Sequence, residues 1–370
     1  MRTGQNIYKR KDGRWEARYY KGRKDNGQII YGSCYGKTYQ EAKHKAEQAK
    51  SDIVTAAHPQ RYQFPTFEVI CDEWMRYNYL RLKQSTCVKY HIAIDKHIKP
   101  HLGKLPLSEV STEAIRQFGA ALLDAEGLAP KTVSDILVLL HSILKYSAKH
   151  YPGTTMTIDI PYPKKAAKEM RVLSKEEQDR LTNYLLTDLD PCKFGVLLAI
   201  WTGIRIGELC ALKWDHIFIE EQMIKIDTTM QRLHNNTHNT SSKTSVVIDS
   251  PKTTSSVRII PIGNQAAMLC KMIDPHNENA YVLTGTERYM EPRLLQYHFH
   301  RFVCRCNLKD ATFHTLRHTF ATRCIEVGFE IKSLSEILGH ANTAITLNRY
   351  VHCSLELKRK NMNKLEVLYM

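Results

Sequence analysis

The first part of the chain alternates apolar and polar positions with the period of a β-strand. In RWEARYYK, successive side chains face opposite sides of a predicted strand, and the turn sequences KDG and GRKDNG separate it from IYKR and QIIYGSCY. Thr38 and Glu41 have the spacing of a capping box, which predicts a helix that runs to about Ala56. Residues 1–56 are therefore predicted to form a small three-stranded sheet with one helix.

The next part of the chain has a helical period. Between residues 65 and 155, apolar side chains recur at the spacing of amphipathic helices, and Ser111 and Pro130 mark the starts of the last two. We therefore predict a bundle of four helices. Its predicted core positions are Phe67, Ile70, Cys71, Trp74, Tyr90, Ile94, Ile98, Ile115, Phe118, Leu122, Val133, Ile136, Leu137, Leu140 and Leu144.

Two proline-containing segments, HPQRYQFP and PGTTMTIDIPYPKKAAKEM, are predicted to be linkers. After the second, helical patterns surround a β region at 223–262, where MIKIDTT, SVVIDS and SVRIIPI alternate as strands and QRLHNNTHNTSSKTS has the composition of a loop. The chain is predicted to be a multidomain α+β protein. Its domains are a sheet with a helix at 1–56, a four-helix domain at 65–155, and a mixed, mainly α domain with a β hairpin or sheet at 170–370.

Charge adds a candidate partner. The 370 residues carry a net charge of +15, with a pI of about 9.3, which favours a polyanionic partner. Residues 1–36 contain nine Lys/Arg and three Asp/Glu among aromatic side chains, a pattern suited to a DNA groove; the alternative is a solvated basic face. The candidate DNA-binding residues are Arg10, Lys11, Arg14, Arg18, Lys21, Arg23 and Lys24.

The chain lacks a run of about 18 apolar residues and an apolar signal core, so we expect a cytoplasmic protein. The ten cysteines do not form the paired spacing of a zinc site, and we expect free, mostly buried thiols.

The segment FHTLRHTFATRC contains candidate chemistry on a predicted helix. His314, Arg317 and His318 share one side, and such groups are costly to bury without partners. The fork of N–H donors on an arginine matches two phosphate oxygens, so this side suits an anion. The adjacent side is predicted to be core and contains Phe313, Leu316, Phe320, Cys324 and Val327.

Three other segments contain candidate polar residues, each of which also has an ordinary structural interpretation. In WTGIRIGELCALKW, Arg205 and Glu208 could form only an intrahelical ion pair. Lys252 in SPKTTSSVRIIPI could be a solvated loop lysine. In ILGHANTAITLNRYVHCS, His340 follows a Leu-Gly helix stop, and Tyr350 could be a packing residue.

Taken together and in this order, these segments resemble the tyrosine recombinase family, the phage-integrase type of site-specific recombinase. The resemblance is specific in TGIRIGEL, PKTTSSVR, HTLRHTFAT, LGH and NRYVH, and looser in the helical region and at the N-terminus. It implies a mobile-element integrase, from a phage or conjugative transposon, that breaks and rejoins DNA during integration and excision. The implied catalytic residues are Arg205, Lys252, His314, Arg317, His340 and Tyr350, with Glu208 and His318 in support.

The resemblance also implies a role for each residue. Tyr350 would attack the scissile phosphate and form a 3′-phosphotyrosyl link, and His314 would take its proton. Arg205 and Arg317 would bind the non-bridging oxygens, and Lys252 would protonate the leaving 5′-oxygen. His340 would donate to the phosphate or help to set the geometry of the site, His318 would make a supporting hydrogen bond, and Glu208 would orient Arg205 or its neighbours. No metal and no cofactor are expected.

The partners implied by the resemblance are double-stranded DNA, at core and arm attachment sites, and three further protomers in a tetramer on DNA. Accessory excision or DNA-bending proteins are possible partners, and no membrane is expected. Three other interpretations remain open: a DNA-binding regulator without catalysis, a metal-dependent phosphoesterase that uses His314, His318 and His340, and a relaxing topoisomerase with the same chemistry.

Overall fold

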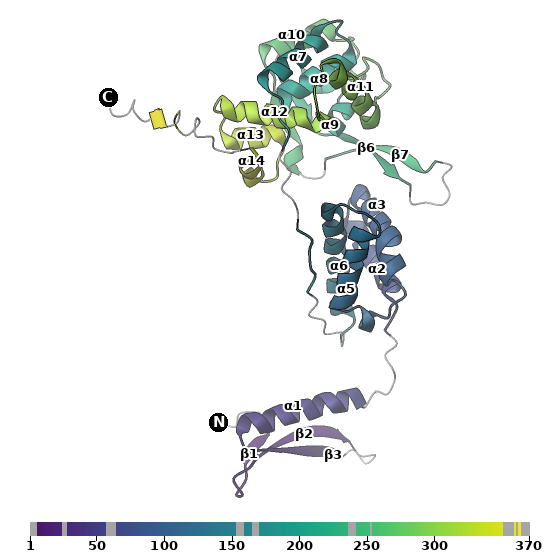
Figure 1. Ribbon diagram of the computed structural model, residues 1–370, viewed down its shortest axis with the longest axis vertical. Coiled ribbons are helices and arrows are strands. Elements are labelled where there is room, and N and C mark those ends of the chain that lie inside the picture. The colour runs from purple at the N-terminus through teal and green to yellow at the C-terminus, as the bar shows by residue number, and fades with distance from the viewer. Residues whose placement is uncertain are drawn as a thin grey trace. The chain divides into compact units, whose positions relative to one another are not determined.

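The computed structural model describes residues 6–23, 28–56, 64–152, 159–164, 170–235, 242–251, 254–350, 359 and 362–363. By internal contacts the chain divides into two compact units. The N-terminal sheet belongs to the first unit, the residues from 162 onward belong to the second, and the helical region contributes to both. The predicted domain boundaries stay predictions, and each group of elements in Figure 1 is described by itself.

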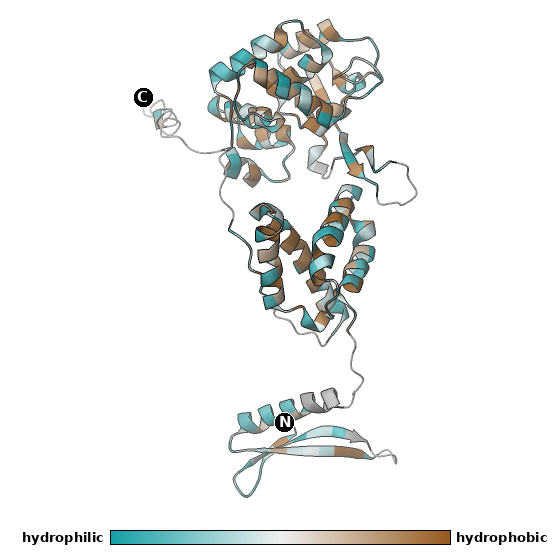
Figure 2. Ribbon diagram, turned by 45° about the vertical axis from the view of Figure 1, so that its right-hand side comes forward, coloured by the Kyte–Doolittle hydropathy of each residue, from teal (hydrophilic) through white to brown (hydrophobic). Residues whose placement is uncertain are grey.

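The N-terminal group is a three-stranded antiparallel sheet in the order β1-β2-β3 with one helix, as predicted. Its elements are β1 (Ile7–Lys9), β2 (Trp15–Arg23), β3 (Ile29–Gly36) and α1 (Tyr39–Ala56). Ala17 of β2 and Ala42 and Ala46 of α1 form a small buried core, and Figure 2 shows the strands of this sheet in mixed hydrophilic and hydrophobic colours. The Thr38 hydroxyl accepts the N–H of Glu41, so the predicted helix start is confirmed.

One side chain of this sheet differs from the simple alternation. Glu16 falls on the polar face of β2, yet it is only 3% exposed. Its carboxylate accepts hydrogen bonds from Arg10 (3.0 Å), Arg18 (3.1 Å) and Ser33 (2.8 Å). These partners cover it and lower its pKa to about 2, with the Ser33 hydrogen bond as the largest cause.

The helical region comprises α2 (Phe67–Asn78), α3 (Gln84–Ala93), α4 (Lys99–Leu102), α5 (Thr112–Asp124) and α6 (Pro130–His150). The third predicted helix starts where expected, because the Ser111 hydroxyl accepts the N–H of Ala114. A π-helical turn at Ile94–Ile98 joins α3 to α4. All predicted core positions of this region are buried except Tyr90, which is half-buried.

The C-terminal group is mainly helical around α8, which is buried on every side. Its helices are α7 (Lys175–Leu186), α8 (Pro191–Thr202), α9 (Ile206–Ala211), α10 (Asn264–Ile273), α11 (Pro292–Arg305), α12 (Phe313–Glu326), α13 (Ile331–Leu338) and α14 (Thr343–Tyr350). Its strands are β4 (Ile217–Phe218), β5 (Met223–Ile226), β6 (Thr229–His234), β7 (Thr244–Asp249) and β8 (Arg258–Pro261).

The strands form two antiparallel sheets, β4-β5-β8 and the β6-β7 hairpin. The three predicted strands are present, but the loop interpretation of QRLH is wrong. These residues belong to β6, because they pair in register with β7 from Thr229–Asp249 to His234–Thr244. The polar composition concealed a hairpin strand that buries Met230 and Leu233.

Two further expectations can be compared with the described residues. Their nine cysteines are free thiols, as predicted. Among the helices of these residues, none has the length and apolarity needed to cross a membrane.

Candidate functional site: an arginine cluster at the end of helix α13

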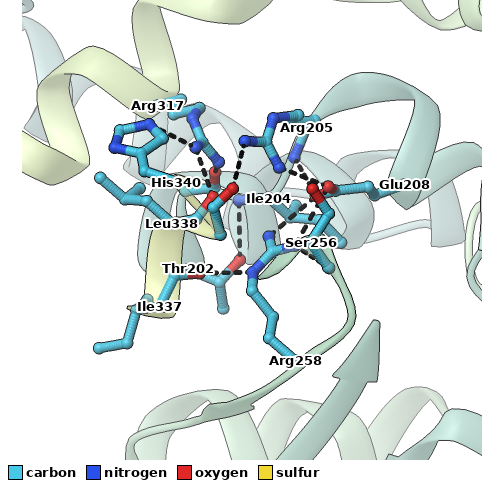
Figure 3. A network of polar contacts seen from close by, with 12 residues as sticks. Thr202, Ile204, Arg205, Glu208, Ser256, Arg258, Arg317, Ile337, Leu338 and His340 are labelled. Carbon is cyan, nitrogen blue, oxygen red and sulfur yellow. Dashed lines mark hydrogen bonds and ion pairs between the residues drawn. The ribbon is translucent and has the colours of Figure 1, made fainter. Parts of the chain in front are cut away.

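Three successive backbone carbonyls at the end of α13 each accept a hydrogen bond from a different arginine (Figure 3). The last carbonyls of a helix lack partners within the helix and form the negative end of its dipole, so they suit cations. The pairs are Arg258 Nε with Ile337 O (2.6 Å), Arg317 Nη2 with Leu338 O (2.5 Å), and Arg205 Nη2 with Gly339 O (2.9 Å).

Gly339 gives this turn its shape. It ends α13 in the left-handed conformation with φ +63°, which confirms the predicted helix stop. A Cβ at this position would lie 3.1 Å from both Cδ and Nη1 of Arg258. A glycine therefore suits the position for two reasons: the backbone angle and the close approach of a guanidinium group.

Arg205 reaches the turn from the start of α9. It is the residue before the helix, and its backbone N–H and Nη1 donate to the two carboxylate oxygens of Glu208, at 3.0 and 2.7 Å. The Arg205 side chain is about one-third exposed, whereas that of Glu208 is buried. Glu208 therefore holds the backbone N–H and one nitrogen of a guanidinium group that remains partly accessible from solvent.

Glu208 also binds a second arginine, Arg258 at the start of β8. Arg258 Nη1 and Nη2 donate to the same carboxylate at 3.1 and 2.9 Å, and both side chains are buried. Burial by itself would raise the pKa of Glu208. The hydrogen bond and charge of Arg258, together with Arg205, outweigh burial and hold that pKa below its usual value.

Arg258 was not among the predicted site residues, although the sequence contains a signal for it. In SVRIIPI, Arg258 alternates in step with Ile260 and Ile262, and both isoleucines are buried. A charged side chain on the core face of a strand requires a buried partner. That partner is Glu208, 50 residues earlier in the chain.

Arg317 is the most enclosed of the predicted arginines. It lies on α12, and its Nη1 donates to the carbonyl of Gly203 at 2.7 Å, while Nη2 lies 3.0 Å from Nε2 of His340. Burial, and next the charge of Arg205, lowers the pKa of Arg317. Strong acceptors on the backbone therefore hold Arg317 in a site where its charge is costly.

His340 follows the glycine turn and bridges two elements. Its Nδ1 lies 2.8 Å from the hydroxyl of Thr346 on α14, and its Nε2 faces Arg317. Since the guanidinium can only donate, Nε2 accepts and the ring proton is on Nδ1. Burial, then Arg317 and Arg205, lowers the pKa of His340 to about 3, so the ring is neutral.

Tyr350 ends α14 and points into the same region. Its ring is buried in a cluster with Ala321, Cys324, Leu334 and Leu338. Its hydroxyl lies 3.0 Å from Nδ1 of His318. Burial raises the pKa of Tyr350, while the charges of Arg317 and the neighbouring Arg349 act in the opposite direction. The phenol is therefore protonated but in contact with cations.

The two histidines of α12 lie next to each other beside Tyr350. The rings of His314 and His318 pack edge to face with centroids 4.5 Å apart. His318 bonds the Tyr350 hydroxyl, and burial followed by His314 lowers its pKa to about 4. A neutral His318 can accept a hydrogen bond from the phenolic hydroxyl, whereas the base role of His314 stays a prediction.

Arg349 is a second site residue that was not predicted. It precedes Tyr350 in NRYVH, is exposed, and its charge acts against burial to lower the pKa of the phenol. Within NRYVH, the sequence predicted a role only for the tyrosine. In α12 one predicted core position is wrong: Val327 is 73% exposed, because it follows the last helical turn as the C-cap.

The structure therefore brings together five of the predicted catalytic residues, and the sixth, Lys252, lies outside the described residues. The five are Arg205, His314, Arg317, His340 and Tyr350, and their supporting residues Glu208 and His318 lie with them.

The predicted DNA-binding residues belong to the N-terminal sheet and are a separate group. Arg10 and Arg14 lie over the ring of Tyr35, at 5.6 and 5.8 Å, and Arg18 lies over Tyr8 at 5.5 Å. Lys11 and Lys21 are exposed, Arg23 ends β2, and Lys24 lies outside the described residues.

The chain is similar to known proteins of one family. Residues 171–356 match the phage integrase family, and residues 66–123 match the phage integrase N-terminal SAM-like domain. A tyrosine recombinase XerC-like protein of Caldanaerobacter subterraneus is 28% identical, over 94% of this chain and 95% of its own. An integrase of Staphylococcus phage L54a is 25% identical, over 82% of this chain and 93% of its own.

Among solved structures, the integrase of transposon Tn1549 in complex with circular intermediate DNA aligns with a TM-score of 0.66. It is 21% identical, and the alignment covers 81% of this chain and 99% of that chain. The fold is thus that of a multidomain integrase. The chain belongs to the phage integrase family and is a tyrosine-type, site-specific DNA recombinase of the mobile-element kind.

Proposed function

We propose that this recombinase integrates and excises a phage or conjugative transposon through a covalent link between Tyr350 and DNA, in the cytoplasm of a bacterial host. The observation that carries the proposal is the position of the Tyr350 hydroxyl, which lies 3.0 Å from Nδ1 of His318 and near enough to Arg317 for that charge to oppose the effect of burial on the pKa of the phenol. A phenol in such a place can attack a phosphate held by the same guanidinium groups.

The reaction exchanges one phosphodiester for another. The Tyr350 oxygen forms a bond to the scissile phosphorus, the bond from phosphorus to the 5′-oxygen breaks, and the 3′-phosphotyrosyl link keeps the bond energy for rejoining. The phenolic proton goes to the imidazole pair of α12. The family resemblance assigns the base role to His314, and the hydrogen bond to His318 supports the phenol.

Charge stabilisation comes from the arginine cluster. Arg205 and Arg317 bind the non-bridging oxygens, whose negative charge grows in the transition state, and His340 supports them. Because carbonyls at the end of α13 and Glu208 already hold these guanidinium groups, little reorganisation is needed. Lys252 protonates the leaving 5′-oxygen, a role that rests on the family resemblance.

The three predicted domains divide the contacts with DNA. Residues 65–155 and 170–370 bind the core site, and the basic sheet of residues 1–56 binds a separate arm site. The exposed arginines and tyrosines of that sheet support this division. As in the family, four protomers act on two duplexes, and accessory proteins influence excision.

A nicked suicide substrate with candidate attachment DNA tests the proposal. Cleavage traps a covalent complex, which a denaturing gel separates from free protein. Tyr350→Phe should abolish the complex and leave DNA binding nearly unchanged. A complex that survives in Tyr350→Phe excludes this nucleophile, and dependence on a chelatable metal favours the phosphoesterase alternative. Deletion of residues 1–56 should remove arm-site binding and preserve core cleavage.

A further inference from the structure

Arg258 is an arginine at the centre of the catalytic region, and each of its three guanidinium nitrogens donates a hydrogen bond inside the protein. A guanidinium group has five N–H donors. Arg258 donates from Nε to Ile337 O, from Nη1 to Glu208 and to Ser256 O, and from Nη2 to Glu208 (Figure 3). The side chain is also 5% exposed. Because Nε, Nη1 and Nη2 of Arg258 all have partners inside the protein, we assign it a supporting role and not that of a ligand for a DNA phosphate.

Its partners come from three parts of the chain that must be aligned for catalysis. Glu208 lies on α9, Ser256 lies just before β8, and Ile337 lies at the end of α13, 79 residues beyond Arg258. Helix α9 follows Arg205, and α13 leads into Gly339 and His340. The side chain of Arg258 therefore connects the segment that contains Arg205, a predicted phosphate ligand, to the segment that contains His340.

The shared carboxylate gives Arg258 a second effect. Oε1 of Glu208 accepts from Nη1 of Arg205, and Oε2 accepts from the backbone N–H of Arg205. Arg258 donates to both of these oxygens as well. Without Arg258, the buried carboxylate would keep Arg205 as its remaining guanidinium partner among the described residues. The tighter pair would draw Arg205 away from an incoming phosphate and neutralise more of its charge.

The geometry of the glycine turn depends on the same side chain. A Cβ added at Gly339 would lie only 3.1 Å from Nη1 of Arg258, so the guanidinium group lies directly against the turn backbone. The Gly339 carbonyl accepts from Arg205, and the next residue is His340. Loss of Arg258 would leave a cavity beneath the turn that positions both groups.

We propose that Arg258 is a positioning residue: it holds Glu208 and the end of α13 so that Arg205 faces the scissile phosphate and His340 keeps its contact with Arg317, and it does not contact DNA itself. The inference rests on the proposed phosphate role of Arg205. It predicts that removal of Arg258 impairs the chemical step far more than the binding of DNA, since only the arrangement in the transition state is lost.

The test uses the full-length protein and a nicked suicide substrate under single-turnover conditions. Arg258→Met should lower the cleavage rate constant on the order of 100-fold, while the DNA dissociation constant changes less than about threefold. Arg258→Lys should recover part of the rate, because lysine keeps the charge but cannot make the bidentate contact to Glu208.

Arg323 provides a matched control in the same domain. It binds Glu326 at 2.7 Å and the distant carbonyl of Leu173 at 2.7 Å. Arg323→Met therefore also removes a structural arginine. If Arg258→Met acts only by loosening the fold, the two variants should lose cleavage in proportion to their loss in Tm, and the proposal is then wrong.

A double-mutant cycle with Arg205 identifies the route of the effect. If Arg258 acts through Arg205, then Arg258→Met should cost clearly less in an Arg205→Ala background than in the wild type, the remainder being its effect through the end of α13, provided that residual cleavage is measurable by adduct formation over hours. A full, additive loss overturns the proposal. Absence of any Tyr350 adduct in the wild-type protein instead contradicts the proposed function, so the two failures are distinct.

Discussion

The hydroxyl oxygen of Tyr350 lies 3.0 Å from Nδ1 of His318, on the helix that also contains Arg317. The nearest imidazole to the predicted nucleophile is thus the one to which sequence reasoning gave only a supporting role. The ring of His314 packs against the ring of His318. The two histidines can therefore be separated by experiment.

Replacement of His318 should slow formation of the covalent complex. His318→Ala removes the acceptor of the phenolic hydrogen bond, so the rate at pH 7 should fall by about 100-fold, the ordinary size of a general-base effect. Single-turnover rates from pH 6 to 9 provide the measurement. The deficit should shrink as pH rises, because hydroxide increasingly ionises a phenol whose pKa is raised.

His314→Ala is the comparison for this prediction. If His314 is the base, as the family resemblance implies, its replacement should cost at least as much as that of His318, with the same dependence on pH. A His314→Ala rate close to that of the wild type would assign proton transfer to His318 alone.

Stability of the catalytic domain should fall as the solution becomes acidic. The pKa values of His318 and His340 are lowered to about 4 and about 3, against about 6.5 in an unfolded chain. Below pH 6.5 the unfolded state therefore binds more protons than the folded state. The contribution of these two histidines to the free energy of unfolding is fully present above pH 6.5 and is lost progressively toward pH 4 and below.

Thermal unfolding at pH 7.5 and pH 5 measures this effect. The decrease in Tm should be smaller in His340→Asn, since an asparagine does not titrate and its amide can still donate to Thr346. An unchanged pH dependence in this variant would contradict the assigned cause.

Arg317→Ala should reduce cleavage by orders of magnitude with a modest loss in DNA affinity. The guanidinium group is anchored by the carbonyls of Gly203 and Leu338 and is preorganised for the charge that develops in the transition state. Filter binding and single-turnover cleavage on the same substrate provide the two quantities. A loss in cleavage that only parallels the loss in affinity would contradict the clamp role.

Glu16 should control specificity at the arm site. It holds Arg10 and Arg18 on a sheet face that also exposes Tyr8 and Tyr35. Glu16→Gln weakens these charge-assisted bonds, yet it also removes a negative charge near DNA. Affinity for arm DNA relative to unrelated DNA should therefore fall several-fold, while non-specific affinity is maintained or rises.

Glu47 provides the control for that experiment. It is exposed on α1, and Glu47→Gln makes the same change in net charge without altering the partners of Arg10 or Arg18. Competition binding with both variants at one salt concentration separates charge from positioning. Equal ratios of specific to non-specific affinity in the two variants would contradict a role of Glu16 in specificity.

Misassigned residues show which physical information the sequence lacks. QRLH is polar enough to be interpreted as a loop, but its backbone pairs with β7, and such pairing depends on a partner strand. Val327 continues the apolar stripe of α12, yet the helix ends one residue earlier and leaves it exposed. Both errors arose because the structure of a residue depended on its neighbours in the fold and not only on its own polarity.

Local sequence patterns predicted most of the secondary structure of this protein and its family. The strand period of the N-terminal sheet, the apolar faces of the helical region and the order of the arginine, histidine and tyrosine segments are properties of neighbouring residues, and they sufficed to identify the architecture and the family. Helix stops and caps such as Gly339 and Ser111 were predictable for the same reason.

Only the tertiary structure decided which groups share partners. Three kinds of contact join segments far apart in the chain. Arg205, Arg258 and Arg317 bond successive carbonyls at one helix end, Glu208 bonds Arg258, and Tyr350 bonds His318. The physical reason is that a buried charge must find a complementary group in three dimensions, and sequence spacing alone does not specify where that group will be.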